Sequence, residues 1–253
     1  MSATAIAWIA AGCISGGTLL GIALRTMLPS DHLNADSKDA IKLSAGMISL
    51  MAALVLGLLV SSAKSNFDAT NAAITQGGAR VILLDRVLAH YGAESNEVRE
   101  DLRRAVAVSI EVLWPEDRPT ASGLGAFERT SAMENMLDKI RALRPQTDGQ
   151  RALQAQAERL GNELMLSRWV QIEQAHNPMP MMFLRVLLFW LTILYMSFGL
   201  IAPRNATVVT VLLVGALSLA TAIFLILEMN APMDGVIKVS SGPMRKALEH
   251  LGL

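Results

Sequence analysis

Four long apolar runs are the strongest pattern in the chain. They cover residues 3–24, 41–63, 181–202 and 206–229. Each is long enough to cross the ~30 Å hydrocarbon core of a bilayer, which takes about 20 helical residues. Charged residues make up 17% of the chain, whereas an ordinary soluble domain has roughly 25%. The pattern therefore predicts an all-α membrane protein with four transmembrane helices.

The positions of the runs divide the 253 residues into four parts. Residues 1–63 hold the first pair of runs and residues 181–231 the second pair, which predicts two transmembrane hairpins. Residues 64–180 are largely polar and lack the alternation typical of strands, so we expect a helical domain between the second and third transmembrane helices. Residues 232–253 then form a C-terminal tail.

Helix-ending residues divide the middle domain further. We expect a helix to continue straight out of the second span to Tyr91, with Gly77-Gly78 as the first possible break in it and Gly92 placed to close it. Ser95 can cap a following helix that ends at Leu113, and Asp148 can cap a later one. The other expected helices cover residues 126–143, 149–174 and 243–250.

Positive charge is distributed unevenly about the spans. With four spans, both termini and the middle domain share one side of the membrane, and all but four of the 22 Lys and Arg lie on that side or at its border. Cytoplasmic segments near a membrane are enriched in Lys and Arg. We therefore expect a multi-pass protein of the cell inner membrane with cytoplasmic termini and a cytoplasmic middle domain. Arg25, after an uncharged N-terminal run, favours the opposite orientation.

The second run carries two stripes with helical spacing. Leu50, Leu54 and Leu58 form an apolar stripe, which could contact lipid or protein, or could form rings about a central axis in an oligomer. Apolar rings of that kind gate a pore by dewetting. The second stripe consists of small residues, which let membrane helices approach closely. Its members are Gly46, Ser49, Ala53, Gly57 and Ser61.

Directly after the leucine stripe the same helix becomes polar. The positions in question are Ser61, Ser62, Ser65, Asn66 and Asp68. They could line an aqueous vestibule, or they could be the solvated end of a membrane helix. The sequence favours neither.

Two segments resemble bestrophins. Residues 56–68 resemble the end of the second bestrophin helix, where a Leu-Gly-Phe motif precedes a polar run. Residues 228–235 resemble the segment in which an acidic residue precedes a Pro-Phe-Gly-like turn. The positions of this turn motif are Glu228, Asn230, Pro232 and Asp234. The layout of four spans, with a large region between the second and third, also resembles that of bacterial bestrophin-like proteins.

The resemblance implies a pentameric ion channel with cytosolic termini, whose second helix lines the pore. Placing Leu56-Gly57-Leu58 on the Leu-Gly-Phe motif puts the leucine stripe at the pore neck. The chain departs from the family at Asn66-Phe67-Asp68, where bestrophins carry a tryptophan pair. Only Asp234 stands where animal bestrophins have an acidic calcium cluster, so we do not expect calcium gating.

Glu228 lies near the end of the fourth run. A carboxylate at that place could reach interfacial water, or it could pair with Arg185 near the start of the third run.

Candidate chemistry is otherwise sparse. The four histidines lie far apart and the one cysteine, Cys13, has no partner for a zinc site. We find no phosphate-binding loop or catalytic motif, and the net charge of zero does not suggest nucleic acid. We therefore expect no enzyme, metal or cofactor. The expected partners are membrane lipids, monovalent ions and further copies of the chain.

Two functions are compatible with these features. The first is a bestrophin-like oligomeric ion channel, favoured as a pentamer, with its pore lined by the second transmembrane helix and narrowed by a leucine neck. The alternative is a non-conducting membrane scaffold or sensor that binds a partner through its cytoplasmic helices.

Overall fold

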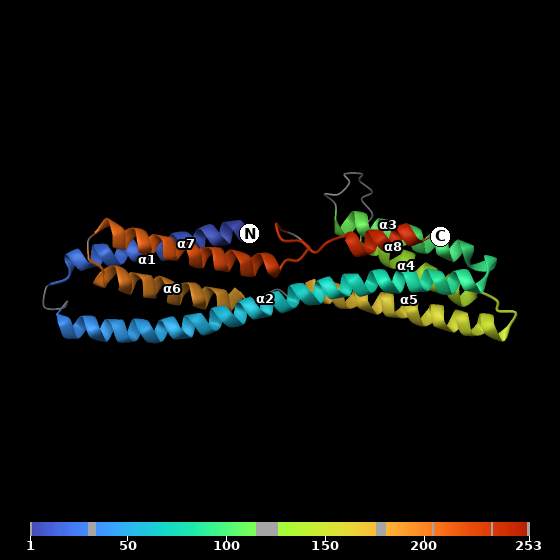
Figure 1. The fold of residues 1–253 in the computed structure, drawn as a ribbon, viewed down its shortest axis with the longest axis horizontal. Helices are drawn as coiled ribbons and strands as arrows, with labels where there is room; N and C mark the ends of the chain where they lie inside the picture. The colour runs from blue at the N-terminus through green and yellow to red at the C-terminus, as the bar shows by residue number, and fades with distance from the viewer. Residues whose placement is uncertain are drawn as a thin grey trace. The chain divides into compact units, whose positions relative to one another are not determined.

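The structure is a computed structural model that describes residues 2–29, 34–114, 126–175, 181–203, 205–233 and 235–251. Within these ranges every regular element is helical (Figure 1), which confirms the predicted all-α class. The elements are α1 (Ala3–Met27), α2 (Ala35–Tyr91), the 3-10 turn η2 (Ala93–Ser95), α3 (Asn96–Leu113), α4 (Ala126–Ala142), α5 (Asp148–Ala175), α6 (Met181–Ile201), α7 (Ala206–Met229) and α8 (Gly242–His250). Helices α1, α2, α6 and α7 are long and apolar enough to cross a membrane.

The chain divides into two compact units. The first, here called the membrane unit, comprises Met1–Phe67 and Pro178–Ile237. The second, here called the helical unit, comprises Asp68–Asn177 and Lys238–Leu253. This division follows packing within the chain. The four-part division drawn from hydropathy, at residues 63, 180 and 231, stays a prediction.

Glycines bring two helices of the membrane unit into backbone contact. Helix α1 packs mainly on α6 and α7, so its principal partners are not its neighbours in sequence. A Cβ atom at Gly17 would lie 2.7 Å from the carbonyl oxygen of Thr192, and one at Gly21 or Gly199 would meet backbone atoms more closely still. Small residues allow such an approach between membrane helices. Cys13 lies on the exposed side of α1.

Helix α2 joins the core of the membrane unit through one face. Ala52, Leu59 and Ala63 are buried there. They share a cluster with buried residues of α1, α6 and α7, among them Ala10, Ile14, Leu184, Leu187, Ala220 and Ile223. The apolar core thus uses a face of α2 that the sequence stripes did not identify.

Helix α2 is continuous through 57 residues and ends at Tyr91, directly before Gly92, where the sequence predicted its end. Gly77 and Gly78 lie inside it without ending it. Gly78 is buried, and a Cβ atom there would lie 2.9 Å from the carbonyl oxygen of Pro243 at the start of α8. Gly92 ends the helix with φ 125°, a conformation that glycine adopts without strain.

An aliphatic core holds the helical unit together. Its largest fully buried side chains on α2, α3 and α4 are Leu84, Leu88, Leu102, Met136 and Ile140. The C-terminal tail joins this unit at Val239, whose carbonyl oxygen accepts a hydrogen bond of 2.8 Å from the indole nitrogen of Trp114.

Ser95 is the N-cap residue of α3, as predicted, but neither Ser95 nor Asp148 makes the expected capping hydrogen bond. Ser95 precedes α3 but its hydroxyl makes no cap, because Oγ lies 2.5 Å from the carbonyl oxygen of Leu88 and 2.8 Å from that of Gly92. At α5, Thr147 supplies the cap: its Oγ1 accepts from the backbone nitrogen of Gln150 at 3.1 Å. Asp148 is the first residue of α5 and pairs with Arg151 instead.

Candidate functional site

The three stripe leucines lie together on the exposed side of α2. Leu50, Leu54 and Leu58 are 75%, 66% and 62% exposed in the single chain. Leu43 and Met47 are 71% and 69% exposed and extend the same stripe toward the start of the helix. At about 100° per residue, this face lies roughly opposite the buried Ala52 and Leu59. The leucine face therefore takes no part in the core of its own unit.

The small-residue stripe is mostly exposed in the part of the chain that the structure describes. Gly46, Ala53 and Gly57 are exposed, and Ser49 is half-buried. A Cβ atom at Gly46 or Gly57 would meet no atom within 4 Å. Helix packing through this stripe stays a prediction. The small residues of α2 that belong to the core cluster are Ala52 and Ala63.

The polar residues after the leucines separate into two groups. Ser61, Ser65 and Asp68 are exposed and continue the leucine face, while Ser62 is exposed but turned away from it. Asn66 is partly buried and lies about 160° around the helix from Leu50. Its Nδ2 donates a hydrogen bond of 3.2 Å to Oδ1 of Asn230, beyond the end of α7. A predicted vestibule residue thus meets a predicted turn residue.

Glu228 is buried, with only 4% of its surface exposed. Its Oε2 accepts hydrogen bonds from the backbone nitrogens of Val236 at 2.5 Å and Ile237 at 3.3 Å. Both sequence interpretations of Glu228 are therefore wrong. The carboxylate reaches neither interfacial water nor Arg185, which is exposed, because the chain turns back over the end of α7 and supplies donors.

Gly235 makes this turn possible. Its φ is 146°, and a Cβ atom there would lie 2.5 Å from Oε2 of Glu228. Pro232 lies partly buried in a turn between α7 and Gly235. Asp234 lies outside the described residues. We call the group Asn66, Glu228, Asn230 and residues 235–237 the α7 junction.

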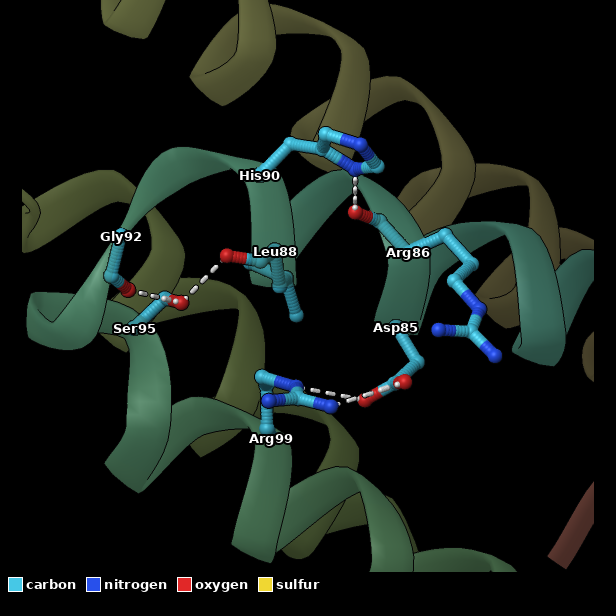
Figure 2. Close-up of polar contacts among 7 residues, drawn as sticks. All are labelled: Asp85, Arg86, Leu88, His90, Gly92, Ser95 and Arg99. Carbon is cyan, nitrogen blue, oxygen red and sulfur yellow. Dashed lines mark hydrogen bonds and ion pairs between the residues drawn. The ribbon is translucent and has the colours of Figure 1, made fainter. Parts of the chain in front are cut away.

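The helical unit contains a separate buried ion pair (Figure 2). Asp85 is 2% exposed and receives two bonds from Arg99: Nε to Oδ1 at 2.8 Å and Nη2 to Oδ2 at 3.1 Å. The hydrogen bonds to Asp85 raise the pKa of the Arg99 guanidinium. The pair joins α2 to α3 across the turn that Gly92 begins. Nearby, Nδ1 of His90 donates to the carbonyl oxygen of Arg86 at 2.7 Å.

Lys139 forms a second, more exposed link in the helical unit. Its Nζ lies 2.5 Å from Oδ2 of Asp101 and 2.6 Å from Oε1 of Glu97. Hydrogen bonding to Asp101, and then to Glu97, raises the pKa of Lys139. The contact joins α4 to α3. Among the residues described, no three His, Cys, Asp or Glu side chains are grouped so as to hold a metal ion.

A family model described as a Bestrophin-like domain matches residues 12–244. This chain belongs to the bestrophin-like family. Its four apolar helices make this bestrophin-like chain a multi-pass membrane protein. Among curated proteins, none matches it.

Two solved structures resemble the bestrophin-like chain in fold. Both are of a bacterial Bestrophin homolog from Klebsiella pneumoniae, each with one mutation. The first has a TM-score of 0.67 at 14% identity and covers 94% of this chain and 97% of its own. The second has a TM-score of 0.62 at 13% identity and covers 96% of both. At such identities the likeness shows the fold alone.

Sequence reasoning recognised the family but missed the α7 junction. One signal was present: an ionisable residue at the end of a membrane span is usually functional or paired. The glycine seven residues after Glu228 marks the place where the backbone approaches the carboxylate. The distance between them along the chain hid the contact.

Proposed function

We propose that this bestrophin-like chain forms a homo-oligomeric ion channel, a pentamer, with a pore lined by α2 and a neck formed by Leu50, Leu54 and Leu58. The observation that carries the proposal is the direction of the leucine face. It lies opposite the face that packs on the core, so symmetry copies can place it at a central axis without disturbing the unit.

The residues that follow the leucines support the same arrangement. Exposed leucines alone are equally compatible with lipid, since hydrocarbon chains are as apolar as leucine. Ser61, Ser65 and Asp68 continue that face, however, and their polar groups need water or protein partners. An apolar neck leading into a polar vestibule meets this need on a single helix face.

The proposed neck contains no charge, so it does not select between cations and anions. Selectivity among monovalent ions would then come from the polar vestibule. The distribution of Lys and Arg favours an inner-membrane protein whose termini and helical unit are cytoplasmic. Membrane lipids would surround the oligomer. No calcium, cofactor or reaction enters this mechanism.

Ion flux from liposomes that hold the purified oligomer tests the proposal. Leu54→Ala widens an apolar neck and lowers its dewetting barrier. A barrier lower by about 1.4 kcal/mol gives a flux about tenfold higher than that of the wild type. Leu217→Ala is the matched control, because Leu217 is a 54% exposed leucine on α7, and it should leave the flux unchanged.

An equal rise in both variants would indicate a general leak rather than a neck. If wild type and Leu54→Ala both fail to pass monovalent ions of either sign, at all voltages and lipid compositions tried, the channel proposal fails. The scaffold or sensor would then be the better account.

A further inference from the structure

The α7 junction contains the buried carboxyl group of Glu228. Among the described residues, no Lys or Arg nitrogen forms an ion pair with Glu228, and its hydrogen-bond donors are the two backbone N–H groups of residues 236 and 237. A buried carboxylate is costly unless it is hydrogen-bonded, and bonds from backbone N–H groups to an ionised oxygen are among the stronger ones. The carboxylate and the returning backbone therefore hold each other in place.

The same junction reaches the helix proposed to line the pore. Asn230 follows Glu228 by two residues, and its backbone N–H bonds back to the last turn of α7. Its side chain accepts the hydrogen bond from Asn66 of α2. Asn66 lies about two helical turns beyond Leu58. The junction thus fixes α2 just below the leucine stripe, on the side away from the leucine face.

We propose that Glu228 is a positioning residue for the neck. It holds the turn at residues 235–237, and through Asn230 and Asn66 it holds α2 in the position that keeps the leucines close to the axis. This role rests on the proposed channel function. The link between Glu228 and the turn can be tested without it.

Hydrogen–deuterium exchange of the full-length oligomer tests the link itself. Glu228→Ala removes the acceptor of two amides, so residues 235–237 should exchange about tenfold faster than in the wild type. Glu228→Gln keeps one acceptor oxygen, so the exchange rate of residues 235–237 in this variant should lie between those of the wild type and Glu228→Ala. Gly235→Ala should match Glu228→Ala, because any side chain at position 235 meets the carboxylate. Glu134→Gln, an exposed carboxylate on α4, is the control and should change nothing.

Liposome flux tests the effect on the neck. Glu228→Ala and Asn66→Ala should each raise flux severalfold, because both release α2 at the same point. In the Leu54→Ala background, where the neck is already wide, Glu228→Ala should add little. Contacts that act through one element are non-additive in this way, whereas distant independent ones add. A general loss of folding would instead lower flux in both backgrounds.

Each outcome decides one part of the proposal. Unchanged exchange at residues 235–237 in Glu228→Ala overturns the link. Faster exchange with unchanged flux, in a protein whose flux rises with Leu54→Ala, overturns the positioning role. The positioning role is also overturned if Glu228→Ala raises flux by the same factor in the wild-type and the Leu54→Ala backgrounds. If Leu54→Ala itself does not conduct, the channel proposal has failed, and the exchange at residues 235–237 still tests the link between Glu228 and the turn.

Discussion

Each of the two units is stabilised internally by its own kind of contact. In the membrane unit, α1 and α6 approach until backbone meets backbone at Gly17, Gly21 and Gly199. In the helical unit, an aliphatic core is joined by charged links such as Asp85 with Arg99 and Lys139 with Asp101. The two units differ in this way because the first is surrounded by lipid. Lipid gives apolar side chains no reason to leave it, so close packing supplies the attraction between helices.

The two units also differ in which residues indicate a functional or structural role. The membrane unit leaves many large apolar side chains exposed, and in lipid most of them need no explanation. The stripe on α2 differs from the others because polar residues follow it on the same face. In the helical unit, by contrast, an exposed charge is ordinary and a buried one such as Asp85 is informative.

The largest expected effect comes from filling a backbone contact in the membrane unit. In Gly199→Val the new side chain would have to displace the backbone of α1 at Thr18, which cannot move without separating the helices. We expect Gly199→Val to lower the free energy of unfolding by more than about 3 kcal/mol, which is above the usual cost of overpacking. Thermal unfolding and the yield of monodisperse oligomer in detergent measure it.

Gly12→Val is the control for this substitution. Gly12 is also on α1, but a Cβ atom there would meet no atom within 4 Å. Equal losses in the two variants would show that α1 and α6 are not held by their glycine contacts.

A smaller loss is expected from the buried ion pair of the helical unit. Asp85→Ala leaves Arg99, whose side chain is 21% exposed, without its carboxylate. Breaking a buried pair costs about 3–5 kcal/mol, and partial exposure of Arg99 favours the lower end. Thermal unfolding of the full chain and amide exchange across α2 and α3 report the loss.

Replacing both partners sharpens the result. Asp85→Leu combined with Arg99→Met should be close to neutral, because neither charge is then left alone. Asp138→Ala, at an exposed pair with Arg141, should change stability by less than about 0.5 kcal/mol. A double variant as unstable as Asp85→Ala would mean that the pair supplies a specific geometry that packing cannot replace.

The smallest effect concerns the end of α4. Nε2 of Gln154 donates to the carbonyl oxygens of Ile140 at 2.9 Å and Leu143 at 3.0 Å. Gln154→Ala should cost about 1 kcal/mol, the usual net value of a hydrogen bond. Amide exchange over the last turn of α4 measures it. Gln156→Ala is the control and should leave that exchange unchanged. Gln156 lies on the same helix as Gln154, and its side chain makes no hydrogen bond within the described residues.

Sequence patterns predicted the features of this fold that depend on solvent or on single residues. The membrane helices follow from run length alone, because a bilayer admits few alternatives. The end of α2 follows from Gly92, whose positive φ suits no other residue as well.

Features that depend on neighbouring residues were not predictable in the same way. Ala52 packs on the core and Ala53 does not, although the two are identical and only about 100° apart on the helix. Thr147 rather than Asp148 caps α5, although both residue types can accept a capping hydrogen bond. Glu228 finds its donors eight and nine residues later, beyond the reach of any local pattern.

The exposed thiol of α1 gives a way of counting the assembly. Cys13 is the one cysteine in the sequence, so each copy of the chain can take at most one maleimide. In the purified oligomer, a fluorophore attached there bleaches in no more steps than there are copies. Records that reach five steps and never exceed five would establish the pentamer with the natural sequence unchanged.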